Sequence, residues 1–161
     1  MKDNVCSIVF GGIGGQGILK AAEVCALAAM HAGHNVKKSE IHGMAQRGGS
    51  VESHVRFGKK VYSPLASSGG ADFLVCFRRD EHARLKRFLN KNSMDLSVHI
   101  EKAKSLISNT RQLNMAFVGM LSKFLPISEK NWMLALQDTF APSVFETNME
   151  VFCRARSMEL I

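Results

Sequence analysis

Residues 5–33 read VCSIVFGGIGGQGILKAAEVCALAAMHAG and contain the pattern that determines the fold. Residues 5–10 form a short apolar run, which is typical of a strand buried on both faces of a parallel sheet. Glycines follow this run at once, and residues 17–32 are rich in alanine, which predicts a helix ended by Gly33. A strand, a glycine loop and a helix in this order indicate an α/β domain.

The rest of the chain continues this alternation. Residues 51–57 alternate between apolar and polar side chains, which predicts a half-exposed strand, and residues 71–77 form a second buried apolar run. We therefore predict a Rossmann-like three-layer α/β/α sandwich with a mainly parallel sheet, formed as one single domain by residues 1–161. The other predicted strands are 35–41, a hairpin partner at 59–65 and a short strand at 97–100. The other predicted helices are 80–90, 101–108, 114–125, 128–138 and 142–156.

The glycine loop is the first candidate site. Gly12, Gly14 and Gly17 fit the pattern G-x-G-x-x-G directly after a strand and before a helix, with Gly15 and Gln16 between them. Glycines allow another group to approach the backbone, and the helix N-terminus offers free N–H groups and a positive dipole to a phosphate or carboxylate. The alternative is a loop that only packs tightly against a neighbouring chain.

The second candidate site follows the strand predicted at 35–41, at the edge where ligands of open α/β sheets bind. A guanidinium there can clamp an anion with two hydrogen bonds, and an imidazole can titrate near neutral pH, although a structural role for the histidine stays open. The candidate residues are His42, Gln46, Arg47, Gly48, Gly49 and Ser50.

The composition excludes several functions. The net charge is +7, and residues 37–91 account for all of it with twelve Lys and Arg against five Asp and Glu. This local basic surface suggests an anionic ligand or an acidic partner, and a solvated face that aids solubility stays open as the alternative. Aromatic residues do not alternate with these cations, so we expect no nucleic-acid binding. No apolar run is long enough to cross a membrane, and we expect a cytoplasmic protein.

The sequence shows no catalytic machinery. Its four cysteines form no CxxC pair, so we expect no iron–sulfur cluster and no metal site. Neither a nucleophile beside a base nor a pair of carboxylates is recognisable, and we predict no catalytic residue. A free-standing NAD(P)-binding protein stays open as the alternative. Its ribose would need an acid such as Glu40, or lysines such as Lys37 and Lys38 for a 2′-phosphate.

Two longer motifs carry a family resemblance. Residues 12–18 (GIGGQGI) and 39–51 (SEIHGMAQRGGSV), supported by residues 61–65, 70–72 and 121–126, resemble the small gamma-type domain of the 2-oxoacid:ferredoxin oxidoreductase family. The motif HGMAQRGGSV at residues 42–51 is similar in particular to the corresponding sequence of the smaller (beta) subunit in the indolepyruvate branch of this family. Family members usually carry a strand, a long hairpin and a further strand where this chain has only residues 90–98, so that segment is either naturally trimmed or missing from the sequence.

The resemblance implies an enzyme complex. Such complexes oxidatively decarboxylate 2-oxoacids, here indolepyruvate or other arylpyruvates, to acyl-coenzyme A and pass electrons to ferredoxin. Thiamine diphosphate and the iron–sulfur clusters then belong to a large alpha subunit. This chain would bind no cofactor alone, would be inactive alone, and would share coenzyme A as a ligand within a hetero-oligomer.

Overall fold

The computed structural model describes residues 4–44 and 48–160. Strands within these residues form one open sheet in the order β2-β3-β1-β4-β5. β3 pairs antiparallel with both β1 and β2, whereas β4 pairs parallel with β1 and β5. β1, β2, β4 and β5 therefore run in one direction and β3 in the other, so the sheet is mainly parallel as predicted. The bounds are β1 Cys6–Ile13, β2 Asn35–His42, β3 Ser50–Gly58, β4 Phe73–Cys76 and β5 Met94–Asp95.

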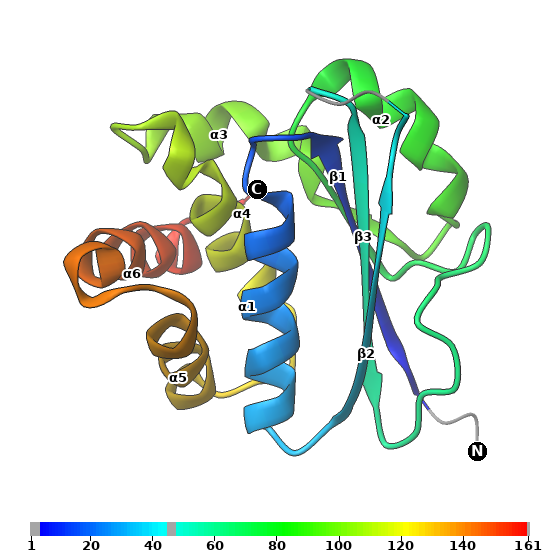
Figure 1. Ribbon diagram of the computed structural model, residues 1–161, viewed down its shortest axis with the longest axis horizontal. Helices are drawn as coiled ribbons and strands as arrows, with labels where there is room; N and C mark the ends of the chain where they lie inside the picture. The colour runs from blue at the N-terminus through cyan, green and yellow to red at the C-terminus, as the bar shows by residue number, and fades with distance from the viewer. Residues whose placement is uncertain (1–3, 45–47, 161) are drawn as a thin grey trace.

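Helices cover both faces of the sheet. Figure 1 shows α1, α4, α5 and α6 on one side and α2 on the other. A large apolar core lies under α1, and a smaller one around Val9, Leu74, Leu85 and Phe88 lies under α2. These two cores confirm the predicted three layers. The helix bounds are α1 Ile18–His31, α2 Arg79–Leu85, α3 Ile100–Ser105, α4 Leu113–Ser122, α5 Glu129–Thr139 and α6 Pro142–Ser157, with 3-10 turns at Lys86–Phe88, Leu96–His99 and Thr110–Gln112.

Small residues let the helices of the larger layer approach closely. The alanines of α1 are buried against the sheet and α5, where larger side chains would hold the elements apart. Gly119 of α4 faces α6, and a Cβ atom there would run into the carbonyl oxygen of Phe152. The rings of Trp132 and Phe152 lie 5.6 Å apart and close the space between α5 and α6. None of the helices in the described ranges is long and apolar enough to cross a membrane.

Two predicted strands are wrong. Residues 59–65 form a loop, because the carbonyl oxygens of Ser63 and Leu65 accept hydrogen bonds from the Arg56 side chain rather than from a strand. The short strand lies at Met94–Asp95 instead of 97–100. The Asp95 carboxylate accepts a hydrogen bond from the backbone N–H of Ser97 at 3.0 Å and so starts a 3-10 turn at Leu96.

The position of β2 also differs from a simple strand–helix–strand unit. A strand, a glycine loop, a helix and a second strand in this order predict a βαβ unit, in which a helix joins two parallel strands. The structure instead inserts β3 between β1 and β2, with Gly12 opposite Val51 and His42 opposite Val51 on the other side. The carboxyl end of β2 therefore lies at the same edge of the sheet as that of β1, but one strand further away.

Candidate functional site

The glycine loop joins β1 to α1 with a left-handed backbone. Gly15 and Gly17 have φ angles of 91° and 78°, which L-residues with a side chain rarely adopt, and Gly17 is the N-cap of α1. A Cβ atom on Gly17 would lie 2.6 Å from Nδ2 of the buried Asn114, whereas one on Gly15 would meet nothing within 4 Å. Gly17 is thus required for close packing, and Gly15 faces open space.

Gln16 fixes this loop against the neighbouring strand. Its Oε1 atom accepts a hydrogen bond from the backbone N–H of Ile13 at 2.9 Å, and its Nε2 atom donates to the carbonyl oxygen of Phe77 at 3.3 Å. A Cβ atom on Gly12 would lie 2.5 Å from that Oε1 atom, so the Gln16 side chain occupies the space that Gly12 leaves free. The predicted ligand residue Gln16 therefore positions the loop.

The second loop contacts the first one. The backbone N–H of Gly14 donates to the carbonyl oxygen of Gly49 at 2.9 Å, and the Ser50 hydroxyl donates to Glu81 of α2 at 3.0 Å. His42 is exposed, and its Nε2 atom lies 3.9 Å from the Glu40 carboxylate. The remaining predicted residues of this loop are Gly48, which has a positive φ, and Gln46 and Arg47, which lie outside the described residues.

A cleft of about 410 Å³ lies on the other side of the glycine loop. Gly15, Gln16 and Phe77 form one wall, at the carboxyl ends of β1 and β4. After β1 the chain continues into β2 and β3, which lie to one side of β1 in the strand order. After β4 it continues into β5, which lies in the opposite direction. This is the switch point at which ligands bind in open α/β sheets. The lining also includes the cationic residues Arg78, Arg79, Lys104 and Arg111.

The cations of this cleft are only partly neutralised. Arg78 Nε donates to both oxygens of Asp80, at 2.7 and 2.9 Å, and this hydrogen-bonded guanidinium lowers the pKa of Asp80. Arg79 and Lys104 share one carboxylate, that of Glu101, at 2.9 and 3.4 Å. Within the described ranges no carboxylate pairs with Arg111. The cleft therefore retains positive charge beside the positive end of the α1 dipole, which favours an anion.

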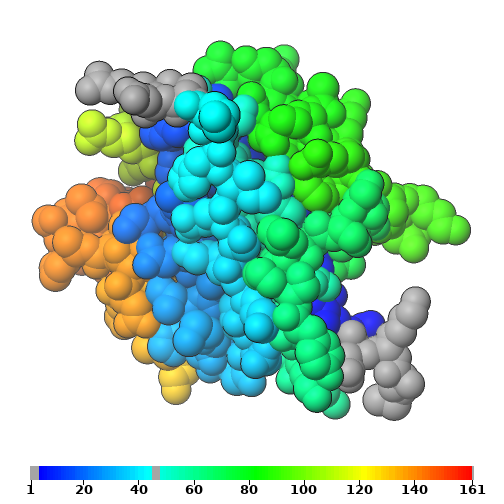
Figure 2. Space-filling view, turned by 45° about the vertical axis from the view of Figure 1, so that its right-hand side comes forward, coloured from blue at the N-terminus to red at the C-terminus, as the bar shows by residue number. Residues whose placement is uncertain are grey.

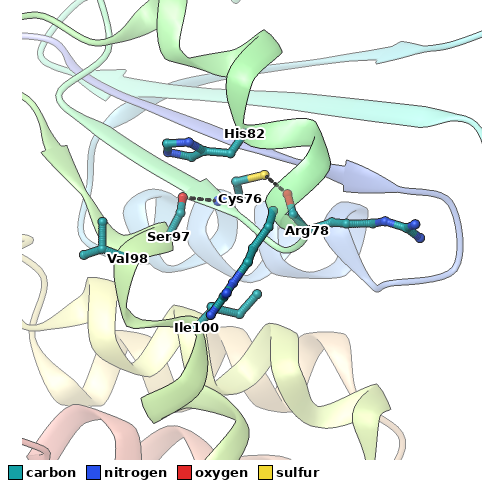
Figure 3. A pocket seen from close by; sticks show the side chains of 7 residues that line it. Cys76, Arg78, His82, Ser97, Val98 and Ile100 are labelled. Atoms are coloured by element: carbon teal, nitrogen blue, oxygen red, sulfur yellow. Dashed lines mark hydrogen bonds between the residues drawn. The ribbon is translucent and has the colours of Figure 1, made fainter.

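A smaller pocket of about 250 Å³ adjoins this cleft through Arg78 and Arg79. Figure 3 shows the Cys76 thiol pointing to the Arg78 carbonyl oxygen, 3.0 Å away, and the Ser97 hydroxyl accepting from the Cys76 N–H at 2.7 Å. Burial raises the pKa of the Cys76 thiol to about 11, and the charges of Glu81 and Asp95 also act to raise it. Cys76 is therefore protonated at neutral pH and a poor nucleophile. His82 on the same pocket is paired with Asp95 at 2.5 Å.

The described residues around the cleft are suited to binding an anion. No group of three His, Cys, Asp or Glu residues in the described ranges is placed to hold a metal ion. The thiols of Cys6 and Cys25 are also shielded from solvent. This burial raises the pKa of each thiol, that of Cys6 to about 12. The residues around the cleft can instead hold an anion through backbone N–H groups and cationic side chains.

Sequence reasoning located the glycine loop but missed the cations opposite it. Gly15 and Gln16 line the cleft, whereas Gly49, which directly precedes β3, contacts the glycine loop at Gly14 and is not part of the cleft lining. One signal was available, because Arg78 and Arg79 directly follow a buried apolar run, where the carboxyl end of a central strand is expected. Lys104 and Arg111 come from α3 and a 3-10 turn more than twenty residues later, and no local pattern places them there.

Comparison with known proteins identifies the family. Residues 7–95, more than half of the chain, match the model described as pyruvate ferredoxin/flavodoxin oxidoreductase. The chain belongs to this family. An indolepyruvate oxidoreductase subunit IorB from Archaeoglobus fulgidus is 52% identical over 88 residues, which cover 55% of this chain and 43% of that protein. The same-named subunit from Thermococcus kodakarensis is 30% identical, and the match covers 91% of this chain and 92% of the relative.

The Thermococcus alignment extends over 185 residues, which exceeds the 161 residues of this chain. That relative therefore contains residues that this chain lacks.

Solved structures share the fold. The gamma subunit of a keto/oxoacid ferredoxin oxidoreductase from Geobacter sulfurreducens superimposes with a TM-score of 0.76 at 19% identity, covering 94% of both chains. A 2-oxoglutarate:ferredoxin oxidoreductase from Magnetococcus marinus, with 2-oxoglutarate, coenzyme A and succinyl-CoA bound, gives 0.79 at 21% identity over 97% of this chain and 31% of that chain. At these identities the likeness concerns the fold alone.

The NAD(P)-binding alternative is not favoured. A dinucleotide fold places the ribose-binding acid on the strand beside the glycine strand. Glu40 lies on β2, which β3 separates from β1, and its carboxylate is already 3.2 Å from the Lys38 ammonium. The geometry that the alternative needs is therefore missing at Glu40.

Proposed function

We propose that this chain is the subunit without thiamine diphosphate and without clusters in a 2-oxoacid:ferredoxin oxidoreductase of the indolepyruvate type. Support comes from the family match over residues 7–95 and from the names of the two curated relatives. The substrates would be indolepyruvate and other aryl-2-oxoacids, the product an acyl-coenzyme A, and the electron acceptor ferredoxin.

In this proposal the reaction itself takes place on a large alpha subunit, which holds thiamine diphosphate and the iron–sulfur clusters. The described residues of this chain do not fit a cluster, because they contain no grouped metal ligands and the Cys6, Cys25 and Cys76 thiols are shielded by burial. The chain would therefore act within a hetero-oligomer, as a domain that shapes and closes the active site of its partner.

The cleft beside the glycine loop is the observation that carries the role of this chain. We assign to it the phosphate groups of coenzyme A, which would be shared with the partner subunit. Its volume of about 410 Å³ is sufficient for part of such a ligand, and its cations come from four positions around the N-terminus of a 14-residue helix. The remainder of the coenzyme would then extend toward the partner, where the acyl group is transferred.

Reconstitution tests this proposal. The isolated chain should show no iron–sulfur absorbance and no turnover of indolepyruvate. Addition of the large subunit should restore reduction of ferredoxin or a viologen dye that depends on both indolepyruvate and coenzyme A. Turnover by the isolated chain with NAD(P), or full activity of the large subunit without this chain, would refute the proposal.

A further inference from the structure

One face of the sheet is only half covered. On the side opposite α1, the α2 helix and residues 66–71 cover β1 and β4, and their apolar side chains form the smaller core. Lys37 and Ile41 of β2 point to this same side, because they lie opposite Arg56 and Glu52 of β3. Figure 2 shows β2 in cyan beside the green segment that follows β3, with no other element over them.

Large apolar side chains are exposed along this face. Ile41, Tyr62 and Leu65 have exposed fractions of 45%, 74% and 43%. The loop that carries Tyr62 and Leu65 is fixed to the sheet, since the Arg56 guanidinium donates to the carbonyl oxygen of Leu65 and the N–H of Val61 donates to Asn35. We call the surface formed by Lys37, Ile41, Lys60, Tyr62 and Leu65 the β2 face.

The charge around these residues has one sign. Lys37, Arg56, Lys59 and Lys60 have no carboxylate partner in the described part of the chain, and the Lys60 ammonium lies 5.0 Å from the centre of the Tyr62 ring. The acid on this side of β3, Glu52, is 2% exposed and is directed to His54, Arg84 and Arg87. The β2 face therefore presents unpaired cations around exposed apolar groups.

We propose that the β2 face is the surface by which this chain binds an acidic surface of its large partner subunit. This inference rests on the function proposed above. Exposed apolar and aromatic groups surrounded by charge are typical of the centre and rim of protein–protein interfaces. A second copy of this chain fits less well, because a two-fold contact would bring the same cations together. Tyr62 is a single aromatic residue among these cations, which does not suit a stacked nucleic acid.

Charge reversal tests the proposal on the reconstituted complex. The variant Lys37→Glu/Lys60→Glu changes two exposed side chains, and Lys20→Glu/Lys130→Glu makes the same change in charge on α1 and α5, away from the β2 face. Binding of each variant to the immobilised large subunit is measured at about 0.1 M and 0.5 M NaCl, where screening differs strongly. The β2-face variant should bind at least tenfold more weakly at low salt, and the control within twofold of the unchanged chain.

Added salt should reduce the difference between the unchanged chain and the β2-face variant, because screening weakens the charge contribution. Tyr62→Ser should also weaken binding, and circular dichroism checks that each variant is folded. If the unchanged chain binds the large subunit and the β2-face variants bind equally well, this surface is not the interface, while the proposed function stands. If the unchanged chain does not bind the large subunit at all, both proposals fail. Preferential loss of nucleic-acid binding in the variant, with the complex intact, would also overturn the inference.

Discussion

The Nε2 atom of His54 lies 2.7 Å from Oε1 of Glu52, and both side chains are almost completely buried. The other ring nitrogen, Nδ1, accepts a hydrogen bond from the backbone N–H of Ala66 at 3.0 Å. Nδ1 must therefore be unprotonated, and Nε2 carries the hydrogen that it donates to Glu52. Arg84 donates to the other Glu52 oxygen at 2.6 Å. One carboxylate thus links β3 to α2 and, through His54, to the loop at Ala66.

The Glu52 carboxylate predicts a loss of stability in acid. Burial alone would raise its pKa, but the hydrogen bonds from His54 and Arg84 and the charge of Arg84 outweigh burial and lower it. A carboxyl with a lower pKa in the folded chain stabilises the fold above its unfolded pKa of about 4.3 and loses this effect as the pH falls through the folded value. Glu52→Gln should lower the free energy of unfolding at pH 7 by about 1–3 kcal/mol.

Urea titrations between pH 7 and pH 3 measure this effect. The free energy of unfolding of Glu52→Gln should fall less steeply below pH 5 than that of the unchanged chain. Glu146→Gln, which changes an exposed carboxylate of α6, should leave the value at pH 7 nearly unchanged. Equal acid slopes for Glu52→Gln and the unchanged chain would show that Glu52 does not carry this dependence.

Substitutions of Gly15 and Gly17, the two glycines of the first loop with a positive φ, should lower the stability of the fold by different amounts. Gly15→Ala introduces strain alone, at about 1–2 kcal/mol, because no atom lies within 4 Å of the new Cβ. Gly17→Ala adds a contact at 2.6 Å with the buried Asn114 and should cost more. Thermal unfolding should show a drop of about 2–4 °C per kcal/mol, larger for Gly17→Ala. Equal drops would mean that Asn114 moves aside without cost.

Local patterns predicted the parts of the fold that depend on neighbours in sequence. The glycine loop and α1 follow from a buried run, glycines and alanines within about thirty residues. The insertion of β3 beside β1 depends on pairings such as Val9 with His54, forty-five residues apart, and no local periodicity specifies them. The cationic side of the cleft could not be predicted for the same reason. Arg79 and Arg111 are far apart in the sequence, and only the arrangement of the folded chain places both in one cleft.

Gln16 should be more important for stability than an ordinary loop residue. Gln16→Ala leaves the N–H of Ile13 and the carbonyl of Phe77 without their partner, at about 1–3 kcal/mol for a buried group. Gln16→Glu keeps an acceptor for Ile13 but sets a carboxylate against the Phe77 carbonyl and inside the cleft. Chemical unfolding should give both variants a lower free energy of unfolding than the unchanged chain. Only Gln16→Glu should also repel an anionic ligand, which a coenzyme A titration of the complex measures.

The last prediction tests whether coenzyme A binds in the cleft beside the glycine loop or at the second sequence motif. Arg111 lines the cleft without a carboxylate partner in the described ranges, so Arg111→Ala removes charge from the ligand rather than from an ion pair. A charge-assisted hydrogen bond contributes about 1.5–3 kcal/mol, and about 1.4 kcal/mol is a factor of ten in affinity. Arg111→Ala should therefore raise the KM for coenzyme A by about ten- to hundredfold in the assembled enzyme, with kcat for indolepyruvate oxidation at saturating coenzyme A nearly unchanged.

Arg47→Ala provides the comparison, because Arg47 is the cation of the second sequence motif. If Arg47 also holds a coenzyme A phosphate, its variant should raise the same KM while the subunits stay assembled. If Arg47 binds a carboxylate of the partner, its variant should weaken assembly and leave the KM of the assembled fraction unchanged. Lys130→Ala on α5 serves as the control for loss of one positive charge. An unchanged KM in Arg111→Ala would refute the assignment of coenzyme A to the cleft, because the free cation there would have no role in binding.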